Sequence, residues 1–340
     1  MPRRLLVVLP NWFGETLFAT PFLRAVRGAY PDGWIAAMGV PRAQEVLAHN
    51  PRVDARILYD EQGEHRSLPG KLQVIRRLRA ERFDLAWVLR RSLTRTGLLL
   101  AGGIPARIGF GNAKSGWLLT ERVGAVDGPV HKAATYLRLL EPLGLHASLG
   151  SYEYYVAEPE REEASRWWAR EGLDRRRPVV VLHVGANWPH KQWPAERFAA
   201  LANRLSDQGG SVVLTGGPED RRVIEAILPR FAPRPVVLAG TTTLRQLAAC
   251  LERADLVVAN DTGVLHIASA LGRPTVGLYG PTSPTITGPL GDPRRNLVVH
   301  HPDCCPYVPC RRPDDGHLGM SSISVEEVFA AAMTLLRREG

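Results

Sequence analysis

The chain has 340 residues, 45% of them hydrophobic and 23% charged, which is the composition of a soluble globular protein and more length than one hydrophobic core usually needs. No apolar run reaches the roughly 18 residues that span a bilayer. The net charge of +9 indicates an anionic partner such as a phosphate-bearing small molecule, a membrane face or a nucleic acid, unless it reflects only a general preference for arginine.

The first half of the chain alternates predicted strands and helices. Residues 4–9, RLLVVL, are a near-continuous apolar run, as in parallel sheets buried on both faces. Because polar residues follow within a few positions, we expect a first strand here and not a signal peptide. A polar loop at 10–16 then leads into a helix that continues toward Ala29. The other elements predicted in this half are strands at 34–38, 57–59 and 85–89 and helices at 41–49, 68–80 and 130–143.

The second half repeats this pattern after residues 150–177, where the amino-acid composition changes. That stretch is rich in tyrosine, tryptophan and charge, and we place the domain boundary there. Strands are predicted at 179–184, 212–215, 236–238 and 256–259, with helices between them and a last helix at 324–338. We therefore predict an α/β protein with two Rossmann-like domains on parallel sheets, at 1–160 and 175–320. Residues 321–340 are expected to form a C-terminal helix that packs back toward the first domain.

The clearest functional signal lies between residues 255 and 291. The predicted strand at 256–259 ends in the turn Asn-Asp-Thr-Gly, a helix follows, and the next strand ends in Tyr-Gly-Pro-Thr. Ligands of open α/β sheets bind beyond the carboxyl ends of the strands. The binding candidates here are Asp261, Thr262, Gly263 and His266. The alternatives are that the first two only cap the helix and that the histidine belongs to the core.

Charged residues in two other loops are further candidates. Lys191 precedes a helix that begins near Pro194, where a cation and free N–H groups can hold phosphate oxygens; the alternative is a solvated loop lysine. Glu15 follows the first strand and is either a general base or an acid that complements the dipole of the next helix. Neither G-x-G-x-x-G nor the P-loop motif occurs, which disfavours nicotinamide dehydrogenases and P-loop kinases.

Basic residues gather between positions 90 and 122, where they either bind an anionic ligand or form a solvated face. The candidates are Arg90, Arg91, Arg95, Arg107 and Lys114. Cys250 lies in an apolar helical pattern and is expected in the core. Cys304, Cys305 and Cys310 share a Pro-rich loop with nearby histidines, but their spacing does not match the usual paired zinc ligands. We therefore expect no metal site, and reduced thiols in a reducing compartment.

Taken together, these motifs resemble glycosyltransferase family 9 over nearly the whole chain. The similarity rests on Gly14-Glu15-x₅-Pro21, on the loop that ends Lys191-x-Trp193-Pro194, and on Asn260-Asp261-Thr262-Gly263-x₂-His266-x-Ala268-x-Ala270. It extends to Gly272-x-Pro274 and Tyr279-Gly280-Pro281-Thr282-x-Pro284. Three further segments are similar to the heptosyltransferase II subgroup: Arg107-Ile108-Gly109-Phe110, Leu118-Leu119-Thr120 and Cys305-Pro306-x₂-Pro309-Cys310.

The resemblance implies a GT-B fold, with an N-terminal acceptor domain, a C-terminal donor domain and a cleft between them. It implies inverting transfer without a metal, in which Glu15 deprotonates the acceptor hydroxyl. Lys191 and the helix start at 262–266 would stabilise the diphosphate, and Asp261 would hold sugar hydroxyls. Asn187 is a further candidate for the donor, and Asn11 joins the basic residues as a candidate for the acceptor. The family base is usually Asp, so this glutamate is one methylene longer.

The sequence thus predicts an inverting, metal-independent transferase that moves heptose from ADP-heptose to the lipopolysaccharide inner core. We expect no cofactor besides the nucleotide sugar, an anionic glycolipid as acceptor, and a cytoplasmic protein peripheral to the inner membrane. One alternative is a family-9 transferase with a different nucleotide sugar and acceptor. Another is a basic Rossmann-like protein that binds nucleic acid without catalysis. The few aromatic residues in the basic region disfavour nucleic acid, because single strands stack on aromatic side chains.

Overall fold

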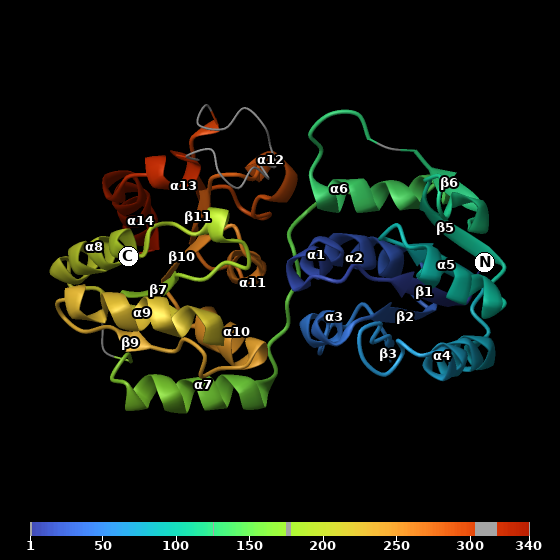
Figure 1. Cartoon of the computed structure of the whole chain (residues 1–340), viewed down its shortest axis with the longest axis horizontal. Coiled ribbons are helices and arrows are strands. Elements are labelled where there is room, and N and C mark those ends of the chain that lie inside the picture. The colour runs from blue at the N-terminus through green and yellow to red at the C-terminus, as the bar shows by residue number, and fades with distance from the viewer. Residues whose placement is uncertain (1, 125, 175–177, 303–317, 340) are drawn as a thin grey trace. The chain divides into compact units, whose positions relative to one another are not determined.

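Figure 1 shows the computed structural model of the chain, which describes residues 2–124, 126–174, 178–302 and 318–339. The chain divides into two compact units, Met1–Tyr155 and Val156–Gly340. Among these described residues, no helix has both the length and the apolar character that crossing a bilayer requires.

The first unit is built on a parallel sheet of six strands in the order β3-β2-β1-β4-β5-β6. The strands are β1 (Arg4–Val8), β2 (Trp34–Gly39), β3 (Ala55–Leu58), β4 (Leu85–Val88), β5 (Ala106–Phe110) and β6 (Glu121–Val123). The central strand β1 pairs with β2, where Arg4 lies opposite Trp34 and Val8 opposite Met38, and with β4 on its other side. This position buries Leu5 to Val8 completely, which explains their continuous apolar character.

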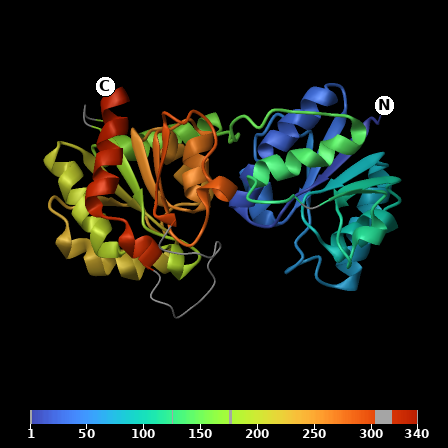
Figure 2. The ribbon, with the colours of Figure 1, turned by 90° about the horizontal axis from the view of Figure 1, so that it is seen from above.

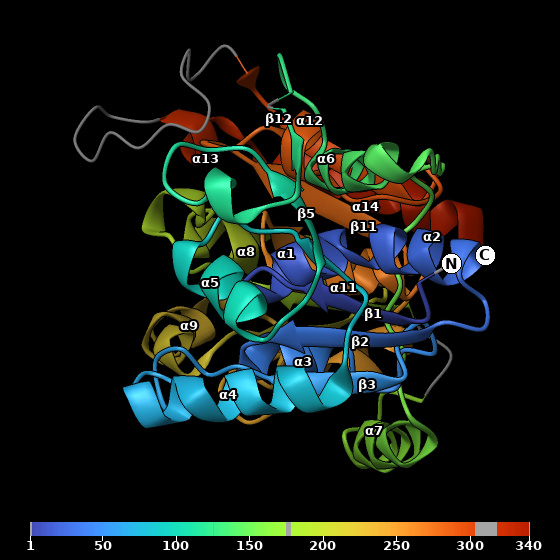
Figure 3. The same ribbon diagram turned by 90° about the vertical axis from the view of Figure 1, so that its right-hand side faces the viewer.

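Helices cover both faces of this sheet. They are α1 (Phe13–Phe18), α2 (Thr20–Ala29), α3 (Pro41–Val46), α4 (Leu68–Glu81), α5 (Leu93–Ala101) and α6 (Lys132–Leu137), with short 3₁₀ helices η1 (Gly116–Leu118) and η2 (Arg138–Leu143). Val74 of α4 and Leu98 of α5 pack with Leu6 and Val8 in one core cluster. On the other face, Phe22 of α2 lies edge-on to the Trp87 ring. Figure 3 shows α4 and α6 on opposite sides of the strands.

The second unit repeats the plan with the strand order β12-β11-β10-β7-β8-β9. Its strands are β7 (Val179–His183), β8 (Ser211–Thr215), β9 (Val236–Val237), β10 (Leu256–Asn260), β11 (Thr275–Tyr279) and β12 (Asn296–His300). Its helices are α7 (Glu158–Arg170), α8 (Ala195–Asp207), α9 (Arg221–Ile227), α10 (Leu244–Glu252), α11 (Gly263–Ala270), α12 (Pro284–Thr287), α13 (Leu318–Ser322) and α14 (Val325–Glu339). Its 3₁₀ helices are η3 (Pro189–Lys191), η4 (Pro218–Asp220) and η5 (Leu228–Arg230). All of its described strand pairings are parallel.

The C-terminal helix α14 belongs to this second unit. Its residues Val328, Ala332 and Leu335 are buried in the same core cluster as Leu201 and Leu205 of α8, and Figure 2 shows α14 running alongside α8. Its apolar stripe is buried among the strands and α8 of this unit, and packing toward the first domain stays a prediction.

Two details add to the sequence prediction. The division between the units falls between Tyr155 and Val156, inside the predicted stretch 150–177, and the charged helix α7 packs against α10 of the second unit. The single helix predicted to reach Ala29 is two helices, α1 and α2, that meet at Ala19. The predicted fold class, two α/β domains on parallel sheets, is confirmed.

Candidate functional site

Three loops of the second unit meet at one edge of its sheet. Strand β10 pairs in parallel with β7 on one side and with β11 on the other. Asp261 directly follows β10, Lys191 lies in η3 between β7 and α8, and Thr282 follows β11. Because parallel neighbours end at the same edge, the fold gathers three side chains that are 21 to 91 positions apart in the sequence.

Asp261 is the centre of this cluster. Lys191 Nζ lies 2.6 Å from its Oδ2, and the Thr282 hydroxyl donates to the same oxygen at 2.7 Å. His266 Nε2 lies 3.6 Å from the other oxygen, Oδ1. Only 4% of the carboxylate side chain is exposed. Burial alone would raise the pKa of Asp261, but the hydrogen bond from His266 and the Lys191 charge outweigh it and hold this pKa well below its usual range.

Asn260, the last residue of β10, holds the loop that carries Lys191 through hydrogen bonds of its side chain. Its side chain is fully buried. The amide accepts a hydrogen bond from Trp193 N at 3.1 Å and donates one to Val184 O at 2.9 Å. In the sequence, Asn260 stands out only as part of a turn, and this function is not predicted from it. The signal was present, since a buried amide at the end of a strand needs partners from neighbouring segments.

The remaining donor candidates lie around this cluster. Thr262 is the N-cap residue of α11, and Gly263 is the first residue of that helix, so free N–H groups of the helix start lie next to Asp261. His266 is buried one turn later. Asn187 is exposed in the loop between β7 and η3. Thr282 contacts the cluster directly, although the sequence singled it out only as part of a family motif.

In the first unit, Glu15 lies in the first turn of α1, just beyond the carboxyl end of β1. Its Oε1 is 2.6 Å from Lys132 Nζ at the start of α6. The Glu15 side chain is 26% exposed, so a ligand can reach it. Sequence analysis did not select Lys132, because 117 residues separate it from its partner and no local pattern marks it.

A cavity of about 780 Å³ lies close to this loop. Asn11, Trp12, Arg42, Glu61 and Arg90 are among its lining residues. Two of these, the asparagine and Arg90, were predicted to bind the acceptor. The lining offers amide, carboxylate and guanidinium groups on one concave surface, which is the chemistry that recognises hydroxyl-rich and anionic ligands.

The other basic candidates do not share one surface. Arg95 is fully buried; its guanidinium bonds to Leu9 O and Asn11 Oδ1 and lies 3.3 Å from Glu61 Oε2. Arg107 donates to the carbonyls of residues 104, 105 and 118 and so holds the chain after α5. Arg91 and Lys114 are exposed. The basic run therefore divides into internal, cavity-lining and solvent-facing groups, which its spacing did not reveal.

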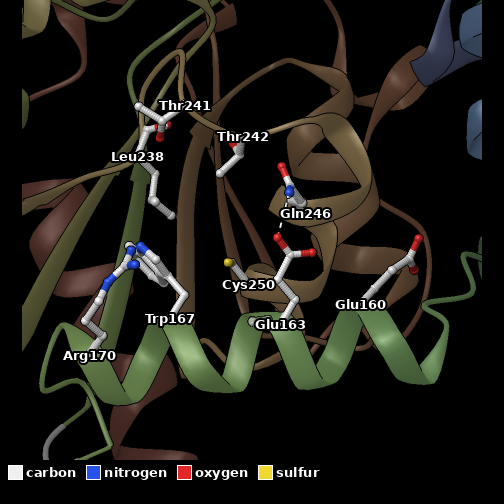
Figure 4. Close-up of a pocket in the computed structure, with 10 residues that line it drawn as sticks. Glu160, Glu163, Trp167, Arg170, Leu238, Thr241, Thr242, Gln246 and Cys250 are labelled. Atoms are coloured by element: carbon white, nitrogen blue, oxygen red, sulfur yellow. Dashed lines mark hydrogen bonds between the residues drawn. The ribbon is translucent and has the colours of Figure 1, made fainter.

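The second unit contains another cavity, of about 240 Å³, between α7 and the segment from Leu238 to Cys250. Figure 4 shows side chains of α7 pointing toward Cys250. Gln246 donates to Glu163 at 2.8 Å, and Glu160 pairs with Arg245 at 2.5 Å. Burial is the main cause that raises the pKa of Cys250 to about 11, so its thiol stays protonated, as expected for a core residue.

The cysteines and histidines that were considered as metal ligands lie in a region that the structure describes only in part. Cys304, Cys305 and Cys310 lie outside the described residues. Of the nearby histidines, His301 bonds to Ser322 at 2.9 Å and to Glu327 at 2.8 Å. Within the part of the chain that the structure describes, no three His, Cys, Asp or Glu side chains are arranged to hold a metal ion.

Two Rossmann-like domains with polar clusters at their strand ends define the class of GT-B glycosyltransferases. Residues 71–311 match the family model of glycosyltransferase family 9 (heptosyltransferase). The chain is 30% identical to lipopolysaccharide heptosyltransferase 2 of Escherichia coli K12 over 86% of this chain and 87% of that protein. The protein therefore belongs to glycosyltransferase family 9.

Solved structures agree with this assignment. A family-9 glycosyltransferase from Veillonella parvula superposes with a TM-score of 0.88 at 28% identity, covering 99% of this chain and 97% of its own. The ADP-heptose lipopolysaccharide heptosyltransferase II of Escherichia coli superposes with a TM-score of 0.81 at 28% identity and covers 99% of both chains. The comparisons favour a transferase over the alternative of a non-catalytic nucleic-acid-binding protein.

Proposed function

We propose that the protein transfers heptose from ADP-heptose to the lipopolysaccharide inner core, with inversion at the anomeric carbon. The observation that carries this proposal is the cluster of Lys191, Asp261, Thr282 and His266 at the strand ends of the second unit. The relatives named as lipopolysaccharide heptosyltransferases, similar over nearly the full chain, support the choice of sugar and acceptor.

Lys191 is proposed to bind the diphosphate of the donor. An ammonium has three N–H donors. Lys191 directs two of them to Asp261, one to Oδ2 at 2.6 Å and one to the backbone oxygen at 3.4 Å, so one donor remains for a phosphate oxygen. The free N–H groups at the start of α11 add partial positive charge at the same place. Charge on the departing diphosphate would thus be stabilised by protein groups, and we propose that no metal ion is needed. Asp261 both orients Lys191 and offers its carboxylate to sugar hydroxyls.

Glu15 is proposed as the general base. The acceptor hydroxyl gives its proton to the Glu15 carboxylate while its oxygen bonds to the anomeric carbon. The bond from that carbon to the diphosphate oxygen breaks at the same time, and ADP leaves with the electron pair. Attack on the face opposite the leaving group inverts the configuration. The partial exposure of Glu15 supports this role, as does its position three residues after Trp12, which lines the first-unit cavity.

The acceptor is proposed to be a membrane-embedded glycolipid at the cytoplasmic face of the inner membrane. Helix α4 supports this, because Leu68 is 71% and Leu72 is 43% exposed. One turn further along the same face lies the exposed Arg76. Residues 66–80 include Arg66, Lys71, Arg76, Arg77 and Arg79 and no acid. Exposed leucines among cations are the chemistry of helices that lie on anionic lipid.

Helix α4 also adjoins the first-unit cavity. The loop residues Asp60, Glu61, Gln62 and Gly63 line the cavity, and Leu68 begins the helix five residues later. A β-carbon on Gly70 would lie 2.2 Å from Glu64 O, so the absence of a side chain lets the loop pack onto the first turn of α4. A lipid surface on α4 would therefore present its sugars next to the cavity.

Turnover of defined substrates tests the proposal. The purified protein is incubated with ADP-heptose and the inner-core glycolipid, and a panel of other nucleotide sugars is run in parallel with mass-spectrometric detection. We expect the glycolipid to gain one heptose, with the anomeric configuration inverted by NMR and the rate unchanged by EDTA. Preferred turnover of another nucleotide sugar, or retained configuration, would contradict it.

A further inference from the structure

Lysine is rare in this chain and is used at the two candidate sites. Of the 43 basic residues only four are lysines: Lys71, Lys114, Lys132 and Lys191. Two of them lie 2.6 Å from the acid of a candidate site, Lys191 from Asp261 and Lys132 from Glu15. A guanidinium tends to engage both carboxylate oxygens as a fork, whereas an ammonium is a compact charge that can engage one. At Glu15, the lysine partner thus leaves the second carboxylate oxygen available.

Aromatic side chains pack between α1, which carries Glu15, and α6, which carries Lys132. Phe18, at the end of α1, lies edge-on to the His131 ring at 5.7 Å and 5.4 Å from the Tyr152 ring. His131 is the N-cap of α6, and its Nδ1 accepts a hydrogen bond from the backbone N of residue 133 at 3.1 Å. Its Nε2 lies 3.2 Å from the Tyr152 hydroxyl. The backbone on both sides of the ion pair is therefore held in place.

This anchoring distinguishes the pair from an ordinary surface ion pair. Exposed pairs contribute little because water and salt screen the charges and two long side chains must be ordered to form them. Here the backbone is already ordered, and Tyr136, one turn after Lys132, is buried beside them. Burial first, and then the charge of Glu15, raise the pKa of Tyr136, which shows that the carboxylate lies close to this helix.

We propose that Lys132 is a positioning residue that aims the Glu15 carboxylate at the acceptor hydroxyl. The inference rests on the proposed role of Glu15 as the base. A glutamate has one more side-chain torsion than an aspartate, so its carboxylate samples more positions unless something holds it. Lys132 holds Oε1, and Oε2 takes the proton from the acceptor. The lysine keeps its own protons throughout and does not touch the reacting atoms.

A double-mutant cycle on the full chain tests this role. The variants are Lys132→Met, Lys132→Arg, Glu15→Gln and the double variant Glu15→Gln with Lys132→Met. Arg138→Met is the matched control, because Arg138 directly follows α6 and pairs with Glu141 at 3.3 Å with 32% side-chain exposure, against 39% for Lys132. Each variant is measured for kcat, for both KM values and for its thermal unfolding midpoint.

We expect Lys132→Met to lower kcat about tenfold, a typical size for coupling between residues in contact, with both KM values unchanged. Lys132→Arg should retain more activity than Lys132→Met, and Arg138→Met should behave like the wild type. In the Glu15→Gln background, Lys132→Met should cost almost nothing more, because no carboxylate remains to be aimed. If Lys132→Met does not fold, Lys132→Arg with and without Glu15→Gln supplies the same comparison.

Three results would overturn the positioning role: an equal loss from Lys132→Met in both backgrounds, a raised acceptor KM at constant kcat, or wild-type kinetics of Lys132→Met. The first indicates a purely structural pair, and the second a cation that binds the acceptor itself. Failure of the base assignment is seen separately, as near wild-type turnover of Glu15→Gln alone.

Discussion

At the scale of single residues, each unit pairs an acid with a lysine, and we propose different roles for the two acids. Each places an acid just beyond a central strand and a lysine from a distant segment against it. Asp261 is almost completely buried and receives contacts at both oxygens, so it acts as a fixed charge that organises the loop of Lys191. Glu15 is partly exposed and can exchange a proton with a ligand. The difference in burial separates a carboxylate that orients Lys191 and the donor from one that we propose takes up a proton.

Glu15→Gln should lower kcat at least about 10²-fold, since proton removal by a positioned base contributes about 10²- to 10⁴-fold. The affinity for the nucleotide sugar should stay within a few-fold. Glu15→Asp should retain more activity than Glu15→Gln because it keeps a carboxylate at the cost of reach. Steady-state kinetics and calorimetric titration of the donor measure both quantities. If Glu15→Gln turned over like the wild type, Glu15 would only be an acid that complements the dipole of α1.

Lys191→Ala should reduce kcat/KM for the donor at least about 10²-fold, because charge-assisted contacts to the leaving diphosphate are lost. Asp261→Ala should also weaken donor use, since Lys191 loses its partner. Arg222→Ala, which removes an exposed charge of the same unit, is the control. Circular dichroism checks that the fold persists. If Lys191→Ala used the donor like the wild type, the donor site would be placed wrongly.

At the scale of elements, α4 has two different faces. Val74 and Leu78 bury one face in the core of the first unit, while Leu68 and Leu72 face solvent together with arginines. Cations flank the leucines without any acid between residues 66 and 80. A soluble helix would normally alternate charges on its exposed face, and the membrane contact that we propose for α4 is consistent with this composition.

The double substitution of Leu68 and Leu72 by serine should weaken binding to vesicles with anionic lipid at least about tenfold, because buried methylenes contribute roughly 0.8 kcal/mol each. Arg76→Glu should weaken it further and reduce its salt sensitivity. Co-sedimentation with anionic and zwitterionic vesicles measures this. Leu100→Ser, an exposed leucine of α5, should change nothing. Equal binding of all variants would exclude α4 as the lipid-facing helix.

At the scale of the whole molecule, we propose that each unit recognises one of the two substrates. The lysine–aspartate cluster belongs to the second unit, and the large cavity with Arg42 and Arg90 belongs to the first. Substitutions in one unit should therefore affect one substrate and leave the equilibrium affinity for the other nearly unchanged.

The double substitution of Arg42 and Arg90 by alanine should raise the KM for the acceptor at least about tenfold, because two cation contacts to an anionic ligand are lost. The dissociation constant of the donor should not change. The rise in acceptor KM should be largest at low ionic strength, where charges are screened least. Initial-rate kinetics at two salt concentrations measure this KM, and unchanged acceptor kinetics at low salt would show that these arginines are solvent-exposed residues without a role in binding.

Much of the architecture was determined by the sequence alone. Continuous apolar runs such as residues 4–9 identify strands buried on both faces, since only parallel sheets covered by helices require them. The turn Asn260-Asp261-Thr262-Gly263 indicates a candidate ligand site by its position at a strand end. The family and the reaction class also follow from local motifs, because residues that contact a common substrate class keep their spacing within a loop.

Only the tertiary structure decided which side chains meet. The pairs Lys132–Glu15 and Lys191–Asp261 join residues 117 and 70 positions apart, and no local pattern reports such a contact. The structure also separated Arg95, which is buried and bonds to Leu9 O and the Asn11 side chain, from Arg90 at the cavity, although both look alike in the sequence. The physical reason is that burial and ion pairing depend on strand order and on side-chain direction, which arise when distant segments pack, whereas strand and turn signals depend on neighbours along the chain.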